Sequence, residues 1–142
     1  MTLVIPNEGE VATLENNWKN TTPESFLLKL YSNNYDCVDS STSASFTEVA
    51  NGNGYTTGGK ALARASFSSA VGGSPSSIQY SAGQVWSWTG AIPAVVGYYI
   101  VGATSGKVYH AERLYAGAGQ AFANGDSLTV TPKITYASGI ND

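Results

Sequence analysis

The chain has 142 residues, a net charge of −3 and 12% charged side chains, about half the charged share of a typical globular domain. A single domain of this length, residues 1–142, buries roughly two thirds of its unfolded surface, so its core needs no metal or disulfide. The acidic balance and the absence of a basic run argue against nucleic-acid binding, which needs clustered Lys and Arg. Cys37 is the one cysteine and excludes an internal disulfide.

Two further classes are disfavoured by the distribution of apolar residues. No apolar stretch approaches the ~20 residues that a membrane helix needs, and the N-terminus lacks the basic and apolar regions of a signal peptide. The low charge has two interpretations. Either Thr and Tyr replace charged residues because the chain is β-rich, or part of the surface is covered by neighbours in an assembly, where unpaired charge is costly.

The first 22 residues predict an N-terminal arm with one short helix. Residues 3–5 are expected to be extended and to stop at Pro6. Asn7 and Glu10 have the spacing of a capping box, and a helix is expected over about residues 8–18. Val11, Leu14 and Trp18 follow at i, i+3 and i+7, so we expect this face to be buried, with Trp18 as its anchor.

Residues 95–115 form the strongest local pattern, a predicted β-hairpin around which the fold is organised. Two runs rich in β-branched and aromatic residues flank the polar loop 102–106. The first run is apolar on both faces apart from Gly97, which is typical of a central strand. On the second run, simple alternation places Val108 and His110 on one side and Tyr109 on the other.

The remaining strands are expected on either side of this hairpin. They cover residues 25–31, 77–80, 84–89 and 127–136, with a short one at 46–49 and an ambiguous, bulged one at 55–67. Pro132 interrupts the last strand, which should therefore lie at an edge or be bulged. About seven or eight strands, one helix and many glycine-bounded turns predict an all-β fold, a jelly-roll-like β-sandwich.

No catalytic or metal-binding set is recognisable in the sequence. His110 is the single histidine, so no histidine-based metal cluster can form, and no G-x-S-x-G motif supports a serine nucleophile. The carboxylates are scattered, and no pair indicates glycoside hydrolysis. Asp36 and Asp39 could ligate calcium, although turn residues are the favoured interpretation. We therefore expect no catalytic residue, no cofactor and no metal.

One apparent phosphate-binding motif is rejected. Residues 54–60, GYTTGGK, have the spacing of a phosphate loop, but Ala61 stands where a Ser or Thr must hold magnesium. The strand–loop–helix context is also missing. We interpret the match as chance.

Four aromatic residues near the hairpin have two interpretations. They could form a platform for a sugar or a protein, or they could be core residues of neighbouring strands, which we favour. The four are Trp86, Trp88, Tyr98 and Tyr99. Arg113 is expected at an interface or in a surface ion pair, because Glu112 lies on the opposite face of the strand.

The order of motifs along nearly the whole chain resembles a family of small structural proteins of tailed bacteriophages. These motifs are LVIPNEGE, LKLYSNN, Gly54-Tyr55, VWSWTG, VVGYYIV, VYHAERL and GDSLTVTPKITY. The Gly- and Ser-rich segment 65–77 departs from the pattern. The resemblance implies a non-enzymatic virion protein, made in the bacterial cytoplasm and located on the capsid surface.

The first expectation from this resemblance is a capsid cement or decoration protein. Its partners would be further copies of itself and the major capsid protein, with residues 1–18 as an arm that packs on a neighbour. The alternative is a tail, baseplate or fibre component in which Trp86, Trp88 and the loop 32–45 contact glycan; a depolymerase is disfavoured. The candidate interface residues are Leu3, Val4, Ile5, Trp18, Trp86, Trp88 and Arg113.

Overall fold

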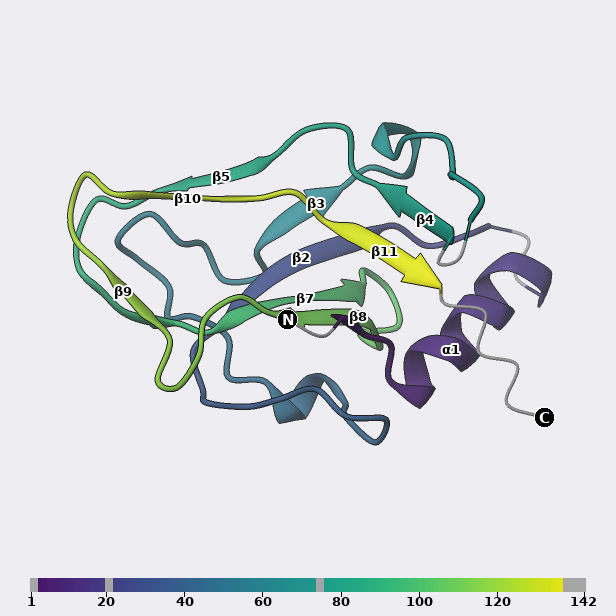
Figure 1. Cartoon of the computed structure of the whole chain (residues 1–142), viewed down its shortest axis with the longest axis horizontal. Coiled ribbons are helices and arrows are strands. Elements are labelled where there is room, and N and C mark those ends of the chain that lie inside the picture. The colour runs from purple at the N-terminus through teal and green to yellow at the C-terminus, as the bar shows by residue number, and fades with distance from the viewer. Residues whose placement is uncertain (1–2, 20–21, 74–75, 137–142) are drawn as a thin grey trace.

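A computed structural model describes residues 3–19, 22–73 and 76–136. In this part the chain is mostly antiparallel β-structure with one short helix (Figure 1). The expected fold class is confirmed at that level. The largest sheet has the strand order β1-β8-β7-β2-β3, where the strands are β1 (Leu3–Val4), β2 (Phe26–Tyr31), β3 (Lys60–Leu62), β7 (Gly97–Gly102) and β8 (Val108–Arg113).

The predicted hairpin is confirmed, and its first arm is central in this sheet. All six residues of β7 are buried, and the strand pairs with β2 on one side and β8 on the other. The strand is therefore central, and its side chains pack in one hydrophobic cluster on each face of the sheet.

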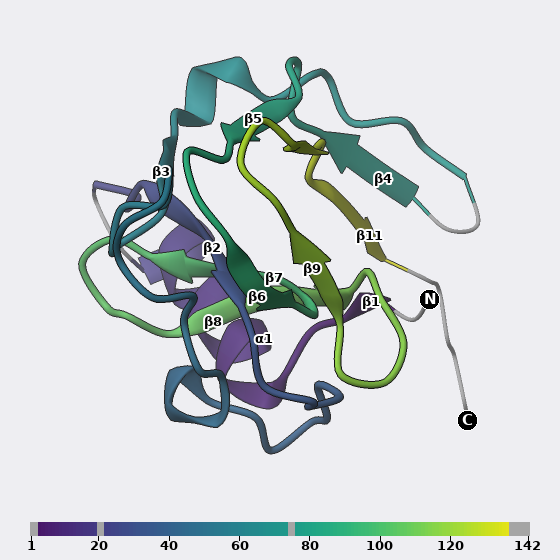
Figure 2. The ribbon, with the colours of Figure 1, turned by 90° about the vertical axis from the view of Figure 1, so that its left-hand side faces the viewer.

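Three two-stranded ribbons complete the β-structure. They pair β5 (Gln84–Ser87) with β10 (Ser127–Val130), β4 (Ser76–Gln79) with β11 (Lys133–Tyr136), and β6 (Ile92–Val95) with β9 (Gln120–Phe122). Figures 1 and 2 show the ribbons β5–β10 and β4–β11 along one side of the five-stranded sheet. Pro132 interrupts the last strand as expected and separates β10 from β11. The carbonyl oxygen of Pro132 accepts the N–H of Tyr80.

Hydrophobic side chains pack on both faces of the large sheet. The cluster between the sheet and the ribbons contains Leu28, Leu30, Trp86, Trp88, Tyr98, Ile100, Leu128 and Val130. The cluster on the opposite face contains Tyr31, Phe46, Val96, Tyr99, Val101, Val108 and Ala111. Phe46 stacks on Tyr99 with 4.7 Å between ring centroids, so the loop that follows β2 covers this second face.

A bulge in β8 overturns the predicted alternation of that strand. Ile100 pairs with His110, whereas Val101 pairs with Val108, so Tyr109 has no partner of its own. Such an extra residue shifts the faces of the strand by one position. Val108 consequently packs in the second cluster, and its expected place beside His110 is wrong.

Two other expected strands are shorter than predicted. Residues 46–49 make only an isolated bridge between Tyr31 and Glu48, because the chain meets the sheet at a single point. The ambiguous segment 55–67 forms a turn, the three residues of β3 and a 3-10 turn, Arg64–Ser66. β6 and β9 were not expected.

Candidate interaction surface

The outer face of the N-terminal helix is apolar and exposed. The helix α1 (Asn7–Leu14) continues into one π-helical turn, Glu15–Lys19. Val11, Leu14 and Trp18 are 49%, 61% and 86% exposed. The sequence pattern identified this face, but the prediction that it is buried, with Trp18 as the anchor, is wrong. An exposed apolar patch of this kind is a candidate contact surface.

Small and polar residues face the sheet instead, because the helix lies very close to the backbone of β8. Gly9, Ala12 and Asn16 are the buried residues of the helix. A Cβ atom at Gly9 would lie 2.5 Å from the carbonyl oxygen of Val108. Only glycine allows this approach, and the approach turns Val11 and Leu14 toward solvent.

Hydrogen bonds hold the helix in this orientation. The carboxylate of Glu8 accepts the N–H of Val108 at 2.7 Å, at the end of β8 that β1 leaves unpaired. In the π-helical turn, Oδ1 of buried Asn16 accepts the N–H of Glu24 at 2.8 Å. π-Helical turns are rare and occur frequently at functional sites. Here the turn places Trp18 outside and Asn16 inside.

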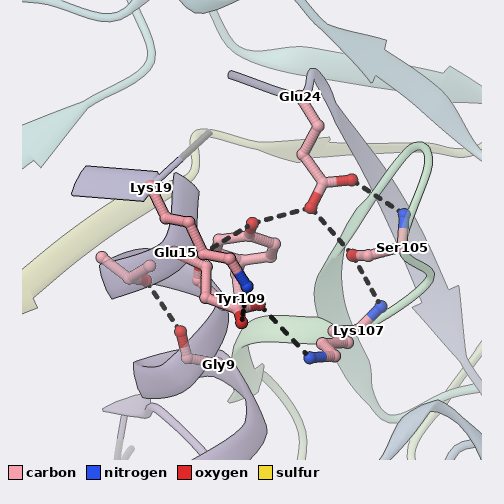
Figure 3. Close-up of polar contacts among 9 residues, drawn as sticks. Gly9, Glu15, Lys19, Glu24, Ser105, Lys107 and Tyr109 are labelled. Carbon is pink, nitrogen blue, oxygen red and sulfur yellow. Dashed lines mark hydrogen bonds and ion pairs between the residues drawn. The ribbon is translucent and has the colours of Figure 1, made fainter. Parts of the chain in front are cut away.

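Charged groups beside the apolar face form ion pairs around one carboxylate. Glu15 lies between two lysines, 3.4 Å from Nζ of Lys19 and 3.9 Å from Nζ of Lys107 (Figure 3). These contacts are exposed and contribute little to stability.

Glu24 connects the helix region to the hairpin loop. Its carboxylate accepts the N–H of Ser105 and the hydroxyls of Ser105 and Tyr109 (Figure 3). It also accepts the N–H of Thr104. Burial raises the pKa of this carboxyl, but the hydrogen bonds outweigh burial and leave the pKa below its usual 4.5. No sequence pattern predicted this arrangement, because Glu24 lies 80 to 85 positions before its partners.

A small groove opens on the side of the helix. It has a volume of about 200 Å³ and lies between the helix, the start of β2 and the ribbon β4–β11. The apolar side chains of its lining include Phe26, Phe67 and Ile134, and the polar ones include Asn17 and Arg64.

The tryptophans of β5 and its C-terminal end do not form a binding platform. Trp86 and Trp88 are each 2% exposed and belong to the main core. This agrees with their interpretation as core residues. It does not agree with their inclusion among the candidate interface residues, because neither indole ring reaches the surface.

The N-terminal strand packs on its own chain. In β1, Leu3 pairs with Glu112 and Val4 pairs with Ala111, and Val4 and Ile5 are half-buried. The backbones of Leu3 and Val4 therefore pair with their own chain, and the expectation that residues 1–18 pack on a neighbouring protein stays a prediction. The edge of β8 offers a nearer partner for these backbone groups.

Arg113 stabilises loops of its own chain. Its guanidinium donates to Oδ1 of Asp36 at 2.9 Å and to the carbonyl oxygens of Tyr115 and Gly117 at 2.9 and 2.7 Å. Asn34 accepts a further hydrogen bond. Arg113 joins the loop after β2 to the loop after β8. Its ion pair is therefore formed with Asp36 of its own chain.

The residues considered for catalysis, phosphate binding or calcium binding lie apart from this surface. His110 is fully buried, neither ring nitrogen has a hydrogen-bond partner, and burial lowers its pKa to about 4. The N–H of Gly58, within the phosphate-loop match, donates to the carboxylate of Glu48, and a strand follows instead of a helix. Asp36 pairs with Arg113.

The described residues contain neither a metal-binding cluster nor a membrane-spanning helix. Within residues 3–19, 22–73 and 76–136, no group of three or more His, Cys, Asp and Glu residues could hold a metal ion. In the same part of the chain no helix has the length and apolar character to cross a membrane.

Comparisons with protein-family models, curated proteins and solved structures find no match to this chain.

Proposed function

We propose that this protein is a non-enzymatic structural protein of a tailed-phage virion, a capsid cement or decoration protein. In this role it binds the major capsid protein lattice and other copies of itself on the capsid surface. The order of sequence motifs supports the proposal through its resemblance to phage structural proteins. The observation that carries it is the exposed apolar face of Val11, Leu14 and Trp18.

The distribution of tryptophans favours this function over glycan binding. Trp86 and Trp88, the two tryptophans considered for a sugar platform, are core residues, while Trp18 extends the apolar face of a helix. A flat apolar face suits contact with protein. Many copies of a protein that each bury a modest area gain strong attachment to a lattice through avidity.

The interior suits a protein that must keep its shape. Both faces of the large sheet are packed, and Glu24 and Arg113 fasten loops across long sequence separations. As part of this proposal we assign the fold to the jelly-roll-like β-sandwiches. The cluster between the five-stranded sheet and the ribbons supports that assignment.

Cryo-EM of the virion tests the proposal directly. We expect density that fits this fold on the outer surface of the capsid shell, with the α1 side in contact with a neighbouring protein. Density on the tail or baseplate would support the alternative, a tail component, and would overturn the cement function. Absence of the protein from purified virions would overturn both. Turnover of host surface polysaccharide by the purified protein would overturn the non-enzymatic assignment.

A further inference from the structure

We propose that a second copy of this chain packs antiparallel across the outer face of α1 and its π-helical turn, related by a two-fold axis. In this arrangement Leu14 of each copy contacts Trp18 of the other. The inference rests on the proposed function only in expecting self-association, and it deepens that function by naming the contact surface.

The first support is the continuity of the apolar face. Val11, Leu14 and Trp18 recur at helical spacing and point away from the sheet. The other large apolar residues exposed in the described part, Val38, Val71 and Val85, lie on separate segments. Only the helix face therefore presents a stripe that a second helix can cover.

The second support is charge. Glu15 and Lys19 each follow a residue of the stripe, and their ion pair places them on one flank of the helix. A two-fold axis brings that flank against the same flank of the other copy. Glu15 then faces Lys19 of the second copy and Lys19 faces its Glu15, so these two pairs are complementary across the axis. Lys107, 3.9 Å from Glu15 in its own chain, adds one positive charge to each flank.

The size of the face predicts a weak, reversible contact. Three side chains with these exposures offer on the order of 300–400 Å² per copy, so the pair buries on the order of 700 Å², below the ~1,200 Å² of standard stable interfaces. A contact of this size forms at high local concentration. Neighbouring copies on a lattice would have such a concentration.

Sedimentation velocity and tryptophan emission test the contact on the purified chain. Among the three tryptophans Trp18 alone is exposed, so its emission reports burial at the contact. We expect dimers to appear as the concentration rises to about 1 mM, a range suited to so small an interface. The blue shift of emission should follow the same concentration dependence.

Two variants distinguish specific contact through this face from non-specific association. Trp18→Ala should raise the dissociation constant at least about tenfold. Val71→Ala, which removes a side chain 65% exposed on another segment, should leave it unchanged. A chain that stays monomeric over the whole range, or a Trp18→Ala variant that dimerises like the original, overturns the proposal.

A charge exchange tests the antiparallel geometry. Lys19→Glu leaves two acids beside Lys107, and Glu15→Lys leaves two bases beside Lys107, so each variant alone should remain monomeric. Their equimolar mixture should form a heterodimer, because each acid then faces a base. A mixture that stays monomeric while the original chain dimerises overturns the two-fold arrangement. Thermal melts of both variants establish that they are folded.

The outcome is independent of the test of the proposed function. A chain that dimerises as described but is absent from the capsid overturns the cement function alone. A capsid protein whose helix face contacts only the major capsid protein overturns this inference alone.

Discussion

The hydroxyl of Tyr109 donates a 2.7 Å hydrogen bond to the carboxylate of Glu24. The same carboxylate holds the backbone of the hairpin loop through Thr104 and Ser105. One side chain from the segment before β2 thus fixes both the loop and the second strand of the hairpin, next to the helix that carries the exposed face.

Glu24→Gln should destabilise the protein by about 1–3 kcal/mol, because hydrogen bonds to a charged acceptor are replaced by weaker ones. Urea unfolding at neutral pH measures the change. Glu10→Gln is the control, since the Glu10 carboxylate is exposed on α1 and its loss should change stability by less than about 0.5 kcal/mol. Equal effects of the two substitutions would contradict the role of Glu24.

The carboxyl group of Glu24 should contribute to the pH dependence of the free energy of unfolding. Its pKa is lower in the folded chain than the usual 4.5, so the unfolded state binds the proton first as pH falls. The stabilisation is therefore complete above pH 4.5 and is lost as pH falls below that value toward the folded pKa. Glu24→Gln should remove this contribution, and unfolding curves at a series of acidic pH values measure it.

His110 should weaken the fold in mild acid. Burial lowers its pKa from 6.5 to about 4, so between these values the unfolded chain carries a proton that the folded chain excludes. Stability should fall with decreasing pH over this window, with a slope approaching about 1.4 kcal/mol per pH unit. Urea midpoints above pH 4.5 isolate this effect from that of Glu24.

His110→Leu supplies the control for that measurement. Both ring nitrogens lack partners, so an apolar side chain of similar size should cost less than about 1.5 kcal/mol at neutral pH or should stabilise the fold. The slope in mild acid should disappear. An unchanged slope in this variant would mean that another group causes it.

Gly9→Ala should destabilise the protein by about 1–3 kcal/mol, although alanine is the better helix former by about 1 kcal/mol. The added Cβ would meet the carbonyl oxygens of Val108 and Tyr109 at 2.5 and 2.9 Å. Thermal unfolding measures the effect, with Glu10→Ala on the exposed side as control. A more stable Gly9→Ala variant would show that the helix does not pack closely on β8.

Trp86→Ala should destabilise the monomer strongly, whereas Trp18→Ala should leave its stability nearly unchanged. Trp86 is 2% exposed and packs in the main core, so its loss should cost about 3–5 kcal/mol. Trp18 is 86% exposed, and its loss should change the stability of the monomer by less than about 0.5 kcal/mol. Urea midpoints at low protein concentration compare the two. A Trp86→Ala variant of unchanged stability that loses binding to a glycan would instead support the alternative, a glycan-binding tail, baseplate or fibre component.

Local patterns predicted the elements whose partners are close in sequence. The hairpin arms, the strand 26–31 and the break at Pro132 depend on alternation, β-branched residues and turn chemistry, which act within a few positions. β6 and β9 escaped prediction, because strands of three or four residues carry too little pattern. The bulge at Tyr109 was missed because nothing in local alternation marks an extra residue.

The sequence by itself determined that this is a mostly β protein with one short N-terminal helix, and it identified Val11, Leu14 and Trp18 as one helical face. Only the tertiary structure decided which way that face points. Gly9 allows the helix to approach the backbone of β8, and at that distance only small side chains fit between them. The large apolar side chains are therefore left on the outside, where they form the proposed contact surface.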